Sequence, residues 1–192
     1  MASSKSPRAA SHTNRFGRTY YLHEGVTKNG RSRYFVRKAI GDGARATMPD
    51  GYEFAESVQG VVSVRRSDPS AAIPPGDLAL VLAELARHEH LRAHTAESVP
   101  NAIVVHEPLD GFAECVDLVT RLGRSTRGIP SRAPRYTPVM KFERTRDGSG
   151  EYVAHRMTYS GDRGWMPLHF GPLSELLPML RAIGTDAFFD LF

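Results

Sequence analysis

The sequence predicts an α+β protein in which an antiparallel β-meander is followed by a mixed helix and strand part with about three helices. Two observations carry this prediction. Residues 19–66 contain short runs of β-branched and aromatic residues separated by turn residues. After residue 77, segments whose apolar residues recur with the helical period of about 3.6 residues alternate with further strand-like runs. The 192 residues, 41% of them hydrophobic, are enough for one good core or two small ones.

The N-terminal part is predicted to be a tail followed by the meander. Residues 1–18 are rich in Ser, Ala, Arg and Gly, and Phe16 is their one large apolar residue, so we expect a disordered basic tail. The meander is then expected over residues 19–66, and Asn29-Gly30 is its strongest hairpin signal. The expected strands are 19–26, 33–39, 52–57 and 61–66.

The remainder, residues 74–192, is predicted to be an α+β part packed on the meander, the two together forming one compact unit. The composition places the boundary between them in the stretch 67–70. A helix is expected after Pro75, with Asp77 as its N-cap and Leu78, Val81, Leu82 and Leu85 on its apolar face. Two strands are expected at 91–97 and 102–107.

The second half of this part is expected to contain two more helices and a hairpin. Apolar residues at helical spacing predict a helix over 110–122 that ends at Gly123. A hairpin is expected from 138–145 and 151–159, followed by a strand at 165–169 and a helix over 173–183. The phenylalanine-rich segment 186–192 either docks on the core or recruits a partner, and docking is favoured.

The charges of the chain are strongly segregated. Residues 1–38 carry nine Lys or Arg and one acid, and residues 121–146 carry eight and one. The stretch 39–120 carries five basic residues against thirteen acids. A net charge of +4 therefore conceals two strongly basic segments, and this pattern indicates an anionic partner.

The first basic segment contains a candidate binding surface on the hairpin 19–39. A two-residue turn at Asn29-Gly30 places Lys28 opposite Arg31 and Leu22 opposite Arg37. One face then combines arginines with aromatic residues, a composition typical of surfaces that stack bases and pair with phosphates. The alternative is a solvated face on which Glu24 pairs with Arg33 or Arg37. On the predicted register, this face holds Tyr20, Leu22, Glu24, Val26, Arg33, Phe35 and Arg37.

The second basic segment contains a loop, residues 123–135, with four arginines and no acid. A flexible loop of this kind suits phosphate contact, because guanidinium groups match phosphate oxygens. The alternative is a solvated connection. The arginines are Arg124, Arg127, Arg132 and Arg135.

The histidines give weaker signals. His88-Glu89-His90 with His94 resembles a metal-ligand cluster, but His88 and His90 would lie about 200° apart on a helix, so no metal site and no cofactor are predicted. An acid–base ribonuclease needs only two well-placed titrating groups, and His94, His106 or His155 with Lys141 are the candidates. Nothing in the sequence indicates that they converge, so catalytic activity is not favoured.

The predicted compartment is reducing. The single cysteine, Cys115, allows no internal disulfide, and no apolar run reaches the roughly 20 residues of a membrane span. We therefore expect a cytoplasmic protein without a membrane partner.

Several patches resemble an uncharacterised bacterial protein family. They are Thr19-Tyr20-Tyr21-Leu22, Arg33-Tyr34-Phe35, Pro49-Asp50-Gly51-Tyr52-Glu53, Gly60-Val61-Val62-Ser63-Val64-Arg65-Arg66 and the ending Asp186-Ala187-Phe188-Phe189-Asp190-Leu191. The resemblance implies a bacterial protein with a similar opening meander and implies no activity.

The sequence thus predicts a protein that binds nucleic acid, either DNA or RNA, with low sequence specificity. The contacts would run mainly from Lys and Arg to phosphates. Two alternatives remain: an adaptor that binds an acidic protein partner, and a metal-independent ribonuclease-like enzyme. The predicted contact residues are Lys28, Arg31, Arg33, Phe35, Arg37, Arg124, Arg127, Arg132 and Arg135.

Overall fold

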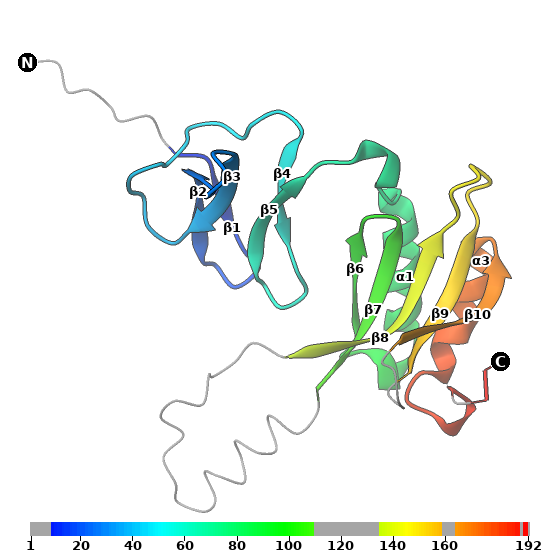
Figure 1. Ribbon diagram of the computed structural model, residues 1–192. Helices are drawn as coiled ribbons and strands as arrows, with labels where there is room; N and C mark the ends of the chain where they lie inside the picture. Colours follow the sequence, from blue (N-terminus) through cyan, green and yellow to red (C-terminus); the bar gives the residue numbers. More distant parts are fainter. Residues whose placement is uncertain (1–8, 110–134, 159–163, 189, 192) are drawn as a thin grey trace, which may run out of the picture. The chain divides into compact units, whose positions relative to one another are not determined.

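The computed structural model describes residues 9–109, 135–158, 164–188 and 190–191. The chain divides into two compact units, Met1–Pro69 and Ser70–Phe192, which we call unit 1 and unit 2 (Figure 1). That residues 74–192 pack on the N-terminal part as one compact unit stays a prediction.

Unit 1 consists of two small antiparallel sheets. Strands β1 (Ser11–Thr13), β2 (Thr19–Val26) and β3 (Ser32–Arg37) form a three-stranded sheet in that order. Strands β4 (Tyr52–Glu56) and β5 (Val62–Arg66) form a separate hairpin. The four strands expected in residues 19–66 are present, but they belong to two sheets instead of one meander.

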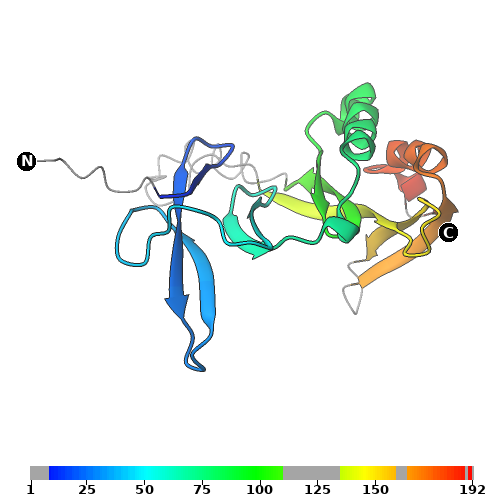
Figure 2. The ribbon, with the colours of Figure 1, turned by 90° about the horizontal axis from the view of Figure 1, so that it is seen from above.

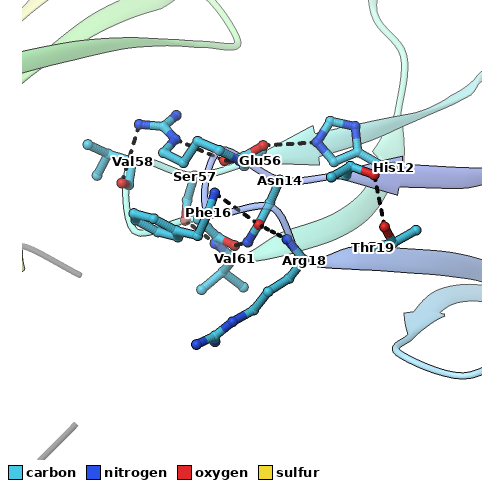
Figure 3. Close-up of polar contacts among 12 residues, drawn as sticks. His12, Asn14, Phe16, Arg18, Thr19, Glu56, Ser57, Val58 and Val61 are labelled. Carbon is cyan, nitrogen blue, oxygen red and sulfur yellow. Dashed lines mark hydrogen bonds and ion pairs between the residues drawn. The ribbon is translucent and has the colours of Figure 1, made fainter. Parts of the chain in front are cut away.

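Residues 9–18 are part of this fold and not the disordered tail that their composition predicts. Strand β1 pairs with the start of β2, and the Asn14 side chain is buried beyond it. Asn14 Nδ2 donates to the Gly60 carbonyl at 2.7 Å, while its Oδ1 accepts from the N–H groups of Phe16 and Arg18 (Figure 3). The segment is ordered because it bonds to the β4–β5 turn, 46 residues away.

Unit 2 is an antiparallel meander covered by helices on one face. The helices are α1 (Pro75–Arg87) and α3 (Leu173–Leu176), which lie on the same side of the sheet (Figure 2). The five strands pair consecutively, in the order β10-β9-β8-β7-β6. They are β6 (Thr95–Val99), β7 (Ala102–Pro108), β8 (Tyr136–Arg144), β9 (Tyr152–Thr158) and β10 (Gly164–Gly171).

One apolar core lies between this sheet and its helices. Val81 and Leu85 of α1 meet Ile103 of β7, Phe142 of β8 and Leu176 of α3, all at most 2% exposed. Ile103 and Phe142 are cross-strand partners, so the alternation of each strand directs both side chains to the helix-covered face. Phe188 is also buried in this core, and its carbonyl accepts a hydrogen bond from Arg156. Phe188 therefore docks on the core, as the favoured of the two interpretations of this segment expects.

The predicted fold class is wrong: the protein is mainly β. The described residues form ten strands in three sheets and only two α-helices, one of four residues. A meander is found in unit 2 instead, where five strands pair in consecutive order. The predicted helix 110–122 lies outside the described residues.

The last predicted helix is interrupted by a proline. The α-helical part ends at Leu176, and residues Leu177–Ala182 continue as a 3-10 helix. Pro178 has no N–H to donate into the α-helical ladder, so an apolar spacing of 3.6 does not produce a continuous α-helix here. Asp77 also differs from its predicted role: the N-cap is Pro74, and the Asp77 carboxylate accepts a hydrogen bond from the Tyr152 hydroxyl. None of the described helices is long and apolar enough to cross a membrane.

Candidate nucleic-acid interface

The predicted β2–β3 hairpin exists, but its turn is one residue longer than expected. The Thr27 N–H donates to the Arg31 carbonyl and the Gly30 N–H to the Thr27 carbonyl, both at 2.9 Å. Gly30 is in the left-handed region at φ 75°, whereas Asn29 has a negative φ. A two-residue turn of the expected kind needs positive φ at both positions, so the chain adopts a three-residue loop instead.

The longer loop shifts the pairing by one residue. Arg37 pairs with Tyr21, not with Leu22, and Phe35 pairs with His23. The predicted face is therefore wrong, because a one-residue slip moves every side chain of one strand to the opposite face. Arg33, Phe35 and Arg37 still share a face, since they alternate along β3. Their neighbours across the sheet are Gly25, His23 and Tyr21 in place of the expected Val26, Glu24 and Leu22.

The opposite face of the hairpin is directed toward the interior of unit 1. Leu22 is fully buried, and Tyr34 packs edge-on against Tyr52 of β4 with ring centroids 4.8 Å apart. Arg33 and Arg37 are exposed on the other face, which we call the outer face, whereas His23 on the same face is buried against the segment 39–42.

Glu24 does not neutralise these arginines. It forms an ion pair with Arg45, and the hydrogen bond from that guanidinium lowers the pKa of the Glu24 carboxyl. The predicted pairing with Arg33 or Arg37 is wrong, because the shifted register places Glu24 on the other face. The other glutamates of unit 1 are paired in the same way: Glu53 with Arg65, and Glu56 with Arg15 and His12.

We call residues 26–38 the basic arm. It contains five exposed cations and no acid, and none of the five has an ion-pair partner among the residues that the structure describes. The cations are Lys28, Arg31, Arg33, Arg37 and Lys38.

Phe35 is engaged within the protein. Its ring stacks on that of His23 at 5.7 Å and an interplanar angle of 22°, and the Arg37 guanidinium carbon lies 5.1 Å from the ring centroid. A Cβ on Gly25 would lie 3.2 Å from the Phe35 ring, so glycine gives this ring room to lie against β2. Phe35 therefore positions Arg37 over its ring and covers His23.

His23 is a component of the site that the sequence does not reveal. It is fully buried, with Nδ1 3.2 Å from the Asp42 carbonyl oxygen and Nε2 3.1 Å from the Ala39 carbonyl oxygen. His23 thus holds the segment 39–42 against β2, on the face that also carries Phe35. In the sequence, the role of His23 is indicated only by its place in the alternating pattern of a predicted strand, and many histidines occupy such positions.

The second predicted contact segment is described only at its end. Arg124, Arg127 and Arg132 lie outside the described residues. Arg135 is exposed just before β8, and its carbonyl accepts a hydrogen bond from the Leu109 N–H at 2.7 Å. The phosphate-binding role of residues 123–135 stays a prediction.

The residues of the enzyme alternative form two separate groups on the sheet of unit 2. His155 and Lys141 are cross-strand neighbours, and Lys141 lies 2.6 Å and His155 3.5 Å from the same Glu143 oxygen. Burial, reinforced by the charge of Lys141, lowers the pKa of His155. His106 is paired instead with Glu97, at 3.2 Å.

The histidines of the metal-like cluster also have different partners. His88 Nε2 lies 3.2 Å from Glu84 Oε1, and His90 Nε2 lies 3.2 Å from the Arg181 carbonyl oxygen. Among the residues that the structure describes, no three His, Cys, Asp or Glu side chains gather as a metal site.

Comparison with known proteins gives no match, whether with protein families, with curated proteins or with solved structures. The resemblance to an uncharacterised bacterial family stays a prediction.

Proposed function

We propose that this protein binds nucleic acid with low sequence specificity, through phosphate contacts of the basic arm. The observation that carries the proposal is the charge distribution of unit 1. Each of its three glutamates is paired with an arginine outside the arm, while the five cations of the arm are exposed and have no described acidic partner. Lysine and arginine side chains in this state are available to neutralise phosphates.

Several further features fit a surface that contacts backbone phosphates. Arg37 is held in place by the Phe35 ring, which lowers the entropy lost when the guanidinium binds. The arginine loop 123–135 remains part of the proposal as a second contact, and so does the cytoplasmic location. An acidic protein partner would use the same charges, and the test below separates it from nucleic acid.

The test is the affinity of the full chain for fluorescent DNA and RNA across a salt series. Replacing Lys28, Arg31 and Arg33 by Ser should weaken binding to every sequence and make the salt slope less negative by roughly 0.7 to 0.9 per lost phosphate contact. The matched control replaces three exposed arginines of unit 2, Arg87, Arg92 and Arg181, by Ser. It removes the same charge and should leave the affinity nearly unchanged.

The results also discriminate the alternatives. Affinity that is absent at low salt, or independent of salt, would overturn nucleic-acid binding and favour the adaptor. Equal losses in the arm and control variants would mean that only net charge matters and that the arm is not a site. A variant with Arg124, Arg127, Arg132 and Arg135 replaced by Ser tests the loop separately.

A further inference from the structure

The outer end of the basic arm is a free two-stranded ribbon. Strand β1 covers β2 only over Thr19–Tyr21, and Ala44 bridges to His23. Every residue from Val26 to Arg33 is exposed, and Val26 has 74% of its surface accessible. We call residues 26–33 the arm tip. Figure 2 shows this hairpin extending away from the rest of unit 1.

The dimensions of the arm tip match one groove of duplex DNA. Strands rise about 3.3 Å per residue, so the two pairs and the three-residue turn beyond Gly25 project by roughly 10 Å. The two strands lie about 4.8 Å apart, and their side chains widen the ribbon to roughly 10 Å. The major groove of B-DNA is about 12 Å wide and 8.5 Å deep and admits such a ribbon, whereas the minor groove, at about 6 Å, does not.

The arm tip lacks the feature that single-stranded ligands require. Binding of single strands relies on aromatic rings on which bases stack. Phe35 is the aromatic residue centred on the outer face, and its ring already contacts His23, Gly25 and Arg37. Tyr21 lies opposite Arg37 at the base of the hairpin, and residues 26–33 contain no aromatic residue, so the arm tip offers cations for a backbone and no ring for a base.

From these observations we infer that the ligand is B-form duplex DNA and that the arm tip enters its major groove. Lys28, Arg31 and Arg33 then contact the phosphates that border the groove. Duplex RNA is excluded by the same geometry, since the major groove of A-form RNA is deep and too narrow for side chains to read. This inference rests on the proposed function and specifies its ligand.

The experiment compares three ligands of one sequence and length: duplex DNA, single-stranded DNA and duplex RNA. The full chain should bind duplex DNA most tightly. Substituting Lys28, Arg31 and Arg33 by Ser should flatten the salt slope on duplex DNA by about 2.7 and change binding of duplex RNA little. The Arg87, Arg92 and Arg181 control should retain the preference for duplex DNA.

Groove-specific reagents then locate the arm. Glucosylated 5-hydroxymethylcytosine fills the major groove and should lower wild-type affinity to that of the arm-tip variant, whereas netropsin in the minor groove should have no effect. Competition by netropsin, with no effect of the sugar, would overturn the inference. Binding of single-stranded DNA or duplex RNA that is as tight as that of duplex DNA, or tighter, would also overturn the inference but would leave the proposed function intact. Failure to bind all three ligands would overturn both.

Discussion

The two units of this protein are stabilised by different means. Unit 2 has a continuous apolar core between its sheet and helices, which includes all seventeen residues of the main buried cluster. The buried apolar residues described in unit 1 are few, namely Ala9, Leu22, Val58 and Val62, and they are accompanied by buried Asn14 and His23. Unit 1 therefore depends on individual polar contacts between distant segments, and unit 2 on packing.

This difference determines how each unit responds to change. Apolar packing is distributed over many neighbours and is insensitive to pH, whereas a buried polar group is costly as soon as its partner is lost. The division also suits the proposed function. Polar contacts between distant segments, which we call polar joints, hold the base of the basic arm and leave its tip free of packing contacts. Substitutions in each unit can test the comparison.

The largest expected effect is a core truncation in unit 2. Leu85→Ala in α1 removes a side chain that is 2% exposed, and the resulting cavity should reduce the free energy of unfolding by about 2–5 kcal/mol. The single tryptophan, Trp165, lies in β10 and reports the denaturation of unit 2 by fluorescence. Hydrogen exchange of unit 1 amides should not change.

The control is another leucine-to-alanine substitution, at an exposed position of the same helix. Leu80 is 50% exposed, so Leu80→Ala should change the stability by no more than about 0.5 kcal/mol. Equal effects of the two variants would contradict the assigned core. Loss of protection in unit 1 would show that the units unfold together, and the contrast between them would not hold.

A smaller effect is expected from a polar joint of unit 1. Asn14→Ala removes the bond to the Gly60 carbonyl and the acceptor for the N–H groups of Phe16 and Arg18. Leaving such groups unpaired costs about 1–3 kcal/mol, which should appear as faster hydrogen exchange throughout β1, β4 and β5. Ser11→Ala, at an exposed position in β1, is the matched control. Unchanged exchange in the Asn14 variant would mean that the joint contributes little.

The sequence predicts the strands and turns well because their signals are local. Asn29-Gly30 marks the β2–β3 turn, and Asp147 to Gly150 marks the turn between β8 and β9, where Asp147 accepts bonds from Ser149 and Thr145. The register of the basic arm is not local in this sense. It depends on whether one or two turn residues adopt positive φ, and Asn29 is compatible with either.

The remaining errors concern contacts between distant residues. Nothing near Asn14 indicates that its side chain will bond to Gly60, so the composition of residues 9–18 does not predict that they are ordered. Gly60 itself combines a φ of 72° with a Phe16 ring that occupies the space a Cβ would need, and neither constraint is readable from the chain. Of the candidate site, the sequence predicts Lys28, Arg31, Arg33 and Arg37, whereas Lys38 is not among the predicted contacts. The roles of His23 and of Glu24 with Arg45 required the structure.

The smallest expected effect is a dependence of unit 1 on pH. Burial raises the pKa of the Glu56 carboxyl, but hydrogen bonds from His12 and from Arg15 outweigh it, so the pKa lies below its ordinary value of 4.5. A group whose pKa is lowered by folding stabilises the fold above the unfolded pKa. That contribution should be lost as the pH falls below 4.5 through the folded pKa, first as faster hydrogen exchange in β1 and β4.

Glu56→Gln should remove this dependence, because the amide does not titrate, at the cost of a constant loss of stability in unit 1. The matched control is Glu53→Gln, also in β4, because both side chains of its ion pair with Arg65 are about 40% exposed and the pair contributes at most about 1 kcal/mol. The Glu53 variant should keep the acid transition of the wild type. If the Glu56 variant kept it as well, another carboxylate would be responsible, and the joint between β1 and β4 would not be the acid-sensitive element of unit 1.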